Sequence, residues 1–421
     1  MADTFDRLAE WLQRAALYDI GLDDLVEETC RRLVDGGVPV TRISIGCLLL
    51  HPVLAMLDAT WDMESGRSSW NTLRRADMDE TVHGRGPFGE INPFARQRLK
   101  ELRHLAGPQL ADELTDFASL RQDLTDPDVA AKYPLFQRLA DKGTTDYVVF
   151  AVPFGNRWFE FDSGMEATTG ATVSLTTNRR SGFQDHEIAG FRGILVPFMV
   201  AARAATERFF VTELTETYLG RISAQAVLSG QIARGDVRRI DCALLYSDMR
   251  ESTLVSQQMA PEDYLATVNR YFECVAGAVL DHGGEVLKFM GDGLLAIFPF
   301  DNRRRFPEDM CAAALSAARE AFHRRADLPE DAQMAFGVGL HVGEAVYGNV
   351  GTEKRLDFTV TGASVALAGR VESMTKTLDA PLLATADFAA MVAPREGRDM
   401  GRHALRGFDD EVGIVAFDPL G

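Results

Sequence analysis

The sequence predicts an α+β chain in which a long helix joins two separate α+β parts. Strand-like runs, RISIGCLLL, DYVVFAVPF and ATVSLTT, lie between Arg42 and Leu175, separated by a helical and polar stretch. A continuous helical segment follows from residue 183 to 220, with Pro197 as an expected kink. Beyond Asp241 the order strand, helix, hairpin, helix, strand predicts a ferredoxin-like βαββαβ sheet.

The composition sets limits on the class of protein. A chain of 421 residues can form two or three domains, each with its own core. Its 44 basic and 62 acidic residues give a net charge of −18, which would repel nucleic acid and anionic membranes. Its apolar runs are too short and interrupted to span a bilayer, and the acidic start MADTFDRLAEW does not resemble a signal peptide. We therefore expect a cytoplasmic protein with no nucleic-acid or membrane partner.

The domain boundaries follow from these patterns. Apolar residues at helical spacing before Gly36 predict one broken helix or two short helices at the start of the chain. We assign residues 1–200 to an N-terminal helix and α+β domain, 201–236 to a helical linker and 237–421 to a second domain. The linker helix could transmit a signal or serve only as a spacer, and the sequence favours neither.

The second domain carries two aspartates at informative places. The strand in DCALLYSD delivers Asp248 to its C-terminal end, and MRESTL then turns into a helix. A helix that starts at Pro261 precedes the hairpin VLKFMGDGLLAIF, whose tight Gly-Asp-Gly turn holds Asp292. A helix from Met310 to Ala326 and an alternating strand, MAFGVGLHV, complete the set.

In a ferredoxin-like sheet the first strand and the central hairpin are neighbours, so Asp248 and Asp292 should converge at one end. Two carboxylates beside a phosphate-binding turn suit two oxygen-coordinated divalent cations such as Mg²⁺. Paired metals of this kind promote in-line displacement at phosphorus. The plainer interpretation is a helix N-cap and a turn residue, and we favour the metal site.

Four motifs resemble, in order and spacing, the catalytic domain of class III adenylate/guanylate cyclases. They are YSDMREST, VLKFMGDGLLAIF, GLHVGEAVYGNVG and DFTVTGASVALAGRVE, and they cover roughly residues 237 to 380. The resemblance implies a head-to-tail homodimer with the nucleotide at its interface. It also implies two Mg²⁺ or Mn²⁺ ions per active site and conversion of ATP into 3′,5′-cyclic AMP and pyrophosphate.

The same resemblance assigns roles to individual residues. Asp248 and Asp292 match the metal-binding aspartates, and the carbonyl of Met249 falls at a backbone metal contact. Arg370 matches the arginine that neutralises charge on the α-phosphate, a role suited to a permanently charged fork.

Four further residues match positions that contact the nucleotide. Lys288 matches the lysine that reads adenine from the partner chain, which favours ATP, and Thr359 at the second base-selecting position is compatible with adenine. Lys354 and Arg355 lie where a basic residue meets the terminal phosphates, and a role as solvated surface charges is an equal alternative.

One position departs from the family pattern. Ala366 stands four residues before Arg370, where the family usually has an asparagine that orients the ribose and the transition state, and Ser364 is a candidate substitute. Loss of one such donor costs roughly 10²–10³ in rate. We expect an active enzyme, with a silent nucleotide-binding signalling module as the alternative. Guanylate cyclase is a weaker alternative, because Lys288 argues against it.

Residues from Leu22 to Arg203 resemble a GAF-type regulatory domain in their pattern of helix, central sheet and exit helix. This would make the first domain a sensor for an unidentified small molecule or other signal, although a purely dimerising role also fits. Candidate ligand contacts are His51, Pro52, His83, Trp61, Trp70 and Trp158, and for each of them a core or surface role is the favoured interpretation.

Overall fold

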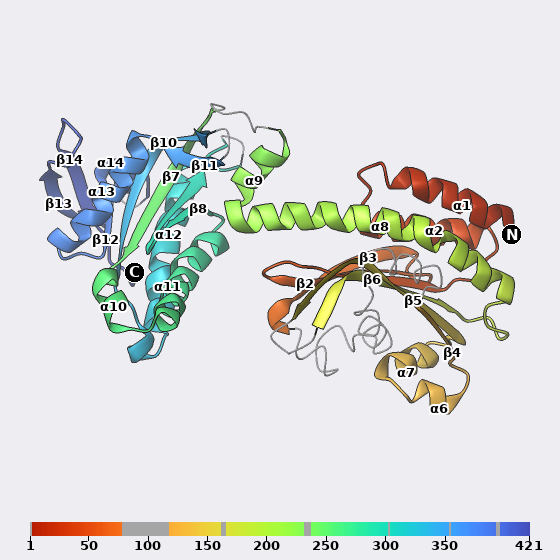
Figure 1. Cartoon of the computed structure of the whole chain (residues 1–421). Helices are drawn as coiled ribbons and strands as arrows, with labels where there is room; N and C mark the ends of the chain where they lie inside the picture. The colour runs from red at the N-terminus through yellow and green to blue at the C-terminus, as the bar shows by residue number, and fades with distance from the viewer. Residues whose placement is uncertain are drawn as a thin grey trace. The chain divides into compact units, whose positions relative to one another are not determined.

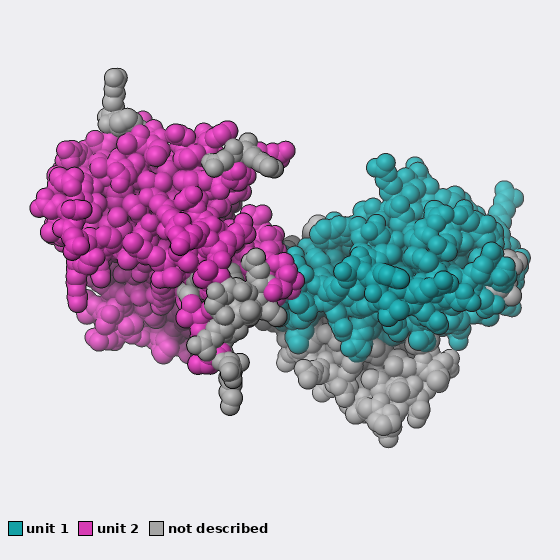
Figure 2. All heavy atoms as spheres, turned by 90° about the horizontal axis from the view of Figure 1, so that it is seen from above, with its two compact units in different colours: residues 1–214 teal, residues 215–421 magenta. Residues whose placement is uncertain are grey.

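A computed structural model describes the chain in seven stretches. These are residues 2–77, 118–160, 166–230, 237–301, 304–352, 355–392 and 396–421. The chain forms two compact units, Met1–Leu214 and Thr215–Gly421 (Figure 2). The division falls inside the segment 201–236, and each unit has its own sheet.

The first unit contains a six-stranded antiparallel sheet in the order β3-β2-β1-β6-β5-β4. Its elements are α1 (Ala2–Ala15), α2 (Leu22–Asp35), β1 (Arg42–Leu48), β2 (Leu54–Asp62), β3 (Arg67–Arg74), β4 (Ala118–Asp123), α6 (Pro127–Ala130), α7 (Pro134–Asp141), β5 (Asp146–Glu160), β6 (Glu166–Thr177) and α8 (Asp185–Leu219). Helices α1, α2 and α8 cover one face of the sheet, and α6 and α7 lie on the other side (Figure 1).

The two faces of this sheet differ in polarity. Along β1 and β2 every second residue is buried, and Ile43, Ile45 and Leu57 pack into the core beneath the three helices. The alternate side chains of the same strands, Ser44 and Asp58 among them, point to the opposite face. The sheet is thus apolar toward α1, α2 and α8 and partly polar on its other side.

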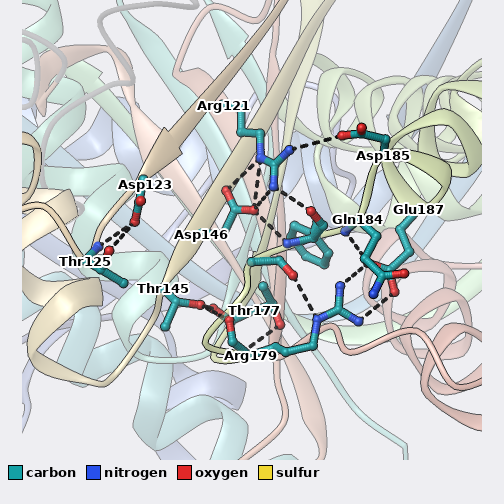
Figure 3. A network of polar contacts seen from close by, with 12 residues as sticks. Arg121, Asp123, Thr125, Thr145, Asp146, Thr177, Arg179, Gln184, Asp185 and Glu187 are labelled. Carbon is teal, nitrogen blue, oxygen red and sulfur yellow. Dashed lines mark hydrogen bonds and ion pairs between the residues drawn. The ribbon is translucent and has the colours of Figure 1, made fainter.

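A buried polar network holds the first turn of α8 against the ends of the strands (Figure 3). Arg179, which follows β6, forms a two-pronged ion pair with Glu187 of α8, whose side chain is 1% exposed. Arg121 on β4 pairs in the same way with buried Asp146 on β5 at 2.8 Å, and Asp146 also accepts the backbone N–H of Phe183 at 2.8 Å. Because an acid as deeply buried as Asp146 or Glu187 is costly without its partner, this network fixes where α8 begins.

Helix α8 is 35 residues long and contains Pro197. Side chains from Phe191 to Ala205 belong to the core of the first unit. In the part of the chain that the structure describes, α8 is also the one helix long and apolar enough to cross a membrane, and 44% of its most apolar window is buried within the protein.

The second unit is built around a mixed sheet in the order β13-β14-β12-β10-β7-β9-β8, with β11 paired to β10. Its elements are α9 (Arg221–Leu228), β7 (Val237–Met249), α10 (Ser252–Gln258), α11 (Pro261–Asp281), β8 (Glu285–Met290), β9 (Gly293–Pro299), α12 (Pro307–Ala326), β10 (Phe336–Thr352), β11 (Arg355–Thr361), α13 (Ala363–Thr377), β12 (Leu382–Thr385), α14 (Ala386–Val392), β13 (Arg398–His403) and β14 (Val412–Ala416). The predicted βαββαβ order is confirmed by β7, α11, β8, β9, α12 and β10 (Figure 1).

Both faces of the central strands are covered. Alternate residues of β7, Ala243 and Leu245 among them, pack with α11 and α12. The intervening residues, such as Cys242 and Leu244, pack on the other face with Ala368 of α13. A strand buried on both sides reads as a continuous apolar run, as in ALLY.

His341 on β10 gives this core a pH sensitivity that can be measured. Its side chain is buried beside Thr385, with Nδ1 3.0 Å from the threonine hydroxyl, and burial lowers the pKa of the imidazole from 6.5 to about 4. As pH falls below about 6.5 the unfolded chain takes up the proton first, so stability is lost until pH reaches about 4. We expect the second unit to lose about 2 kcal/mol between pH 7 and pH 4.5 through this residue.

Urea unfolding of the native chain and of His341→Gln at the two pH values tests this expectation. Circular dichroism follows both units, whereas tryptophan fluorescence follows only the first, because all four tryptophans precede residue 159. The variant should reduce the pH dependence of the circular dichroism transition and leave the fluorescence transition unchanged. An equal pH dependence in both proteins would contradict the assignment.

Candidate active site

Two aspartates meet at one end of the second unit's sheet. Strands β7 and β9 pair with Asp248 opposite Gly293, and Asp292 directly precedes Gly293. The backbone N–H of Met249 donates to the carbonyl of Asp292 at 3.3 Å, and both aspartate side chains are half-buried. The predicted convergence of Asp248 and Asp292 is confirmed.

The Gly-Asp-Gly turn has a steric reason at each glycine. Only Gly291 and Asp292 separate β8 from β9, and Gly291 has φ +67°, the left-handed value that the first position of a type II′ hairpin turn requires. A Cβ atom at Gly293 would lie 3.2 Å from Oδ1 of Asp248. One glycine therefore makes the turn, and the other leaves room for the facing carboxylate.

The electrostatics of the pair suit a hard cation. Burial, and then the negative charge of Asp292, raise the pKa of Asp248, and Lys376 only partly offsets them. No group of three or more His, Cys, Asp or Glu side chains in the described stretches could hold a metal. A divalent ion here would use the two carboxylates together with backbone, substrate or water oxygens, which is how Mg²⁺ is commonly bound.

Two residues beside the pair were not singled out from the sequence. Tyr246 lies two residues before Asp248 on the same strand, and its ring is the nearest neighbour of a Cβ atom built at Gly369 on α13, at 3.4 Å. Glu372, also on α13, is 4% exposed, and burial followed by the charge of Asp248 raises its pKa to about 7. Strand alternation alone could have placed Tyr246 here, but Glu372 depends on how α13 packs across β10.

The family model for the adenylate and guanylate cyclase catalytic domain matches residues 237–385, the segment that carries this geometry. Residues 237–385 are a catalytic domain of this family. The match begins with β7 and ends with β12, so it includes the whole βαββαβ core and α13.

Individual relatives each match part of the chain. An uncharacterized protein of Mycobacterium tuberculosis is 34% identical over 221 residues, which cover 52% of this chain and 39% of that protein. Adenylate cyclase 1 of Rhizobium meliloti is 30% identical over 167 residues, or 38% of this chain and 25% of that enzyme. The chain thus spans well under half the length of these relatives. A solved bacterial light-regulated adenylyl cyclase matches with a TM-score of 0.44 and 20% identity, over 54% of this chain and 65% of that one.

Helix α13 brings the arginine motif of the cyclase domain to the sheet. It packs on β10 and β7, and both Arg370 and Ala366 are exposed on it. Ser364 in its first turn lies against β10, since a Cβ atom at Gly343 would be 2.4 Å from its hydroxyl oxygen. Among the described residues Arg370 forms no ion pair, so its guanidinium remains available to an anion.

The remaining nucleotide-contact candidates of the cyclase domain lie on other strands. Lys288 is on β8, the edge strand of the sheet, where it pairs with Leu295. Thr359 and Arg355 are on β11, opposite Gly348 and Thr352, and their side-chain positions are not described. Lys354 lies outside the described residues. The structure therefore brings Asp248 and Asp292 together but leaves the roles of these four residues as predictions.

The first unit's candidate ligand contacts are mostly structural. Trp61 is buried in the core, and buried His51 accepts the backbone N–H groups of Val53 and Leu54 at its Nδ1 atom. Trp70 is 53% exposed and packs edge-on against Phe209. The others are placed as follows: Pro52 is exposed, the side chain of Trp158 is not described, and His83 lies outside the described residues.

Replacement of Asp292 by asparagine should separate metal binding from folding. Without metal the variant loses a like-charge contact, so we expect it to be equally stable or more stable by about 0.5 kcal/mol, because solvent screens a half-exposed pair. Its affinity for Mn²⁺ should fall at least about tenfold.

Electron paramagnetic resonance of free Mn²⁺ during titration, together with thermal unfolding, makes both measurements. Asp309→Asn, which removes an exposed acid from the first turn of α12, is the matched control and should bind Mn²⁺ as the native chain does. Unchanged Mn²⁺ affinity in Asp292→Asn would exclude this aspartate as a ligand.

Proposed function

We propose that the chain is an adenylate cyclase that converts ATP into 3′,5′-cyclic AMP and pyrophosphate at the interface of a head-to-tail homodimer. The observation that carries this proposal is the meeting of Asp248 and Asp292 at adjacent strand ends within a cyclase catalytic domain. The first unit would regulate the reaction in response to a signal, and the protein would act in the cytoplasm.

In the proposed reaction the ribose 3′-hydroxyl attacks the α-phosphorus of the same ATP, and the bond to the pyrophosphate oxygen breaks. Asp248, Asp292 and the carbonyl of Met249 would hold two Mg²⁺ or Mn²⁺ ions. Bound ions would lower the pKa of the attacking hydroxyl and neutralise charge on the phosphates. The two carboxylates carry like charge, and a bound cation would relieve their repulsion, consistent with the raised pKa of Asp248.

The other side chains would bind the charged and polar parts of the nucleotide. Arg370 would stabilise the charge that develops on the α-phosphate, since its guanidinium is permanently charged and exposed on α13. Lys288 of the partner chain and Thr359 would select adenine. Lys354 or Arg355 would contact the terminal phosphates.

A homodimer suits the surface around Lys288. The two residues after it on the edge strand, Phe289 and Met290, are 52% and 36% exposed. An exposed sheet edge that carries large apolar side chains is a surface that proteins normally cover, and a second copy of the chain could do so.

A silent nucleotide-binding module is the second candidate, and Ala366 supports it. This exposed alanine lies one helical turn before Arg370, so no amide there can orient the ribose. We favour activity because the metal-ligand pair and the arginine are both retained. Guanylate cyclase activity is the weaker alternative, since Lys288 favours adenine and a named adenylate cyclase is among the relatives.

Incubation of purified chain with ATP or GTP and Mg²⁺ or Mn²⁺ tests the activity. We expect cyclic AMP and pyrophosphate in equal amounts from ATP. Asp248→Asn should lower the rate at least about 10³-fold, because one metal ligand is lost, and Asp309→Asn should retain it. Measurable ATP binding without product would support the silent module, and a preference for GTP would overturn the adenine assignment.

Complementation tests the shared site. Asp292→Ala and Lys288→Ala should each be inactive alone, because every site of either homodimer lacks one group. Co-expressed chains should regain about a quarter of native activity, since half of the dimers are mixed and each mixed dimer has one complete site. If the co-expressed pair stays as inactive as its parents, the site is not shared between chains.

A further inference from the structure

An open cavity of about 410 Å³ lies in the first unit, between α7 and the strand ends on the partly polar side of the sheet. Arg42 on β1, Asp62 at the end of β2 and Thr176 on β6 line it, and Arg138 and Lys142 enter from the end of α7. We propose that this cavity binds a small organic carboxylate. Of the ligand contacts predicted for this unit, the four whose side chains the structure describes (His51, Pro52, Trp61 and Trp70) do not line it. Binding of a ligand here does not require catalysis in the second unit.

Arg42 is the central feature of the cavity. The half-buried guanidinium makes one long hydrogen bond, from Nη2 to the hydroxyl of Thr60 at 3.4 Å, and forms no ion pair within the described part of the chain. Burial lowers the pKa of Arg42, the negative charges of Asp58 and Asp62 partly offset this, and the charge of Arg138 adds a smaller lowering. An arginine remains charged in a protein. A guanidinium that has lost part of its hydration and contacts no anion is therefore costly, and binding of an anion would lower that cost.

Two acids, Asp58 and Asp62, attract Arg42 electrostatically, but neither forms an ion pair with it within the described part of the chain. Asp58 is connected to Arg42 only through hydroxyls: Thr60 donates to Ser44 at 2.8 Å, and Ser44 donates to Asp58 at 3.3 Å. Burial raises the pKa of Asp58, so its carboxylate is itself poorly solvated. This hydroxyl chain orients Arg42 and leaves its remaining N–H donors for a molecule in the cavity.

The opposite wall supplies a second set of cations. Arg138 and Lys142 are four residues apart, at the end of α7 and at its C-cap, so they extend to the same side. Neither forms an ion pair among the described residues. Two arginines that face one cavity can bind the two oxygens of a carboxylate with forked, charge-assisted hydrogen bonds.

The balance of charge selects the class of ligand. Asp62 and Glu64 also line the cavity, so the three cations and two acids among its described lining residues leave one net positive charge. This suits a monoanionic carboxylate better than a polyphosphate. The acids, and the hydroxyls of Thr41 and Thr176 that lie 3.1 Å apart, can accept hydrogen bonds from an amino or hydroxyl group on the same molecule. The volume is within the usual range of roughly 300–1,000 Å³ for small-ligand sites.

Occupation of the cavity could reach α8 through the sheet. Ile43 follows Arg42 on β1 and points to the opposite face, where it packs in the same core as Ile194 and Phe198 of α8. A ligand that draws Arg42 toward α7 would therefore act on a strand that supports the long helix.

Isothermal titration of the full chain with L-glutamate, L-lactate and inorganic phosphate tests the proposal. We expect saturable binding of at least one carboxylate with a Kd below about 1 mM, and weaker binding of phosphate. Arg138→Gln, an exposed substitution, should raise the carboxylate Kd about tenfold, and Arg42→Gln should raise it further. Arg7→Gln, which removes an exposed arginine of α1, is the matched control and should leave the Kd unchanged.

Tryptophan fluorescence of each variant confirms that the first unit is folded, and Arg138→Gln keeps the test valid if Arg42→Gln does not fold. Absence of saturable carboxylate binding up to about 10 mM would overturn the proposal. Equal affinities in the native chain and in Arg138→Gln would overturn it as well, and so would binding of phosphate alone.

Discussion

The antiparallel pairing of β7 with β9 is the constraint on which the second unit depends. Its register places Asp248 opposite Gly293, and the two-residue turn before Gly293 places Asp292 beside it. A slip by one residue would send every side chain of the strand to the other face, moving Asp248 away and burying polar groups in the core. The apolar residues of both strands, Leu244 and Leu294 among them, are fully buried and hold this register. Packing energy is therefore what keeps two like charges together.

The parts of this site that the sequence predicted are those set by local rules. A two-residue turn, a strand that ends in an acid and a helix that starts at Pro261 need no distant information. The ferredoxin-like order then follows from chain order, because few topologies connect these elements. Glu372 was missed since its burial near Asp248 is created by α13 crossing β10, where a Cβ atom at Gly339 would touch the backbone of Glu372 at 2.4 Å.

The first unit was harder to predict because its informative residues are defined by cross-strand neighbours. Sequence reasoning selected aromatic and histidine residues, and Trp61 and His51 are buried parts of the scaffold. In the sequence Arg42 is the first residue of a predicted strand, and no local pattern marks it as a ligand-binding residue. Its environment is made by Thr60 from β2, Thr176 from β6 and Arg138 from α7, three segments that only the folded chain assembles.

Buried charged side chains that have an ion-pair partner belong to the structural framework, whereas the two groupings of like charge at the proposed binding sites, one in each unit, have no such partner among the described residues. Glu187 and Asp146 are more deeply buried than Arg42, yet each has a two-pronged arginine partner and further backbone donors, so neither needs another ligand. Asp248 with Asp292, and Arg42 with Arg138, are like charges that the described chain leaves without a contacting counter-ion, although Lys376 near the first pair and Asp58 and Asp62 near Arg42 partly offset them. Folding disfavours such groupings, because desolvation and repulsion both oppose them. A bound ion of opposite charge removes both costs at once. The sign of the missing charge thus points to a cation at the strand ends of the second unit and to an anion beside α7 in the first.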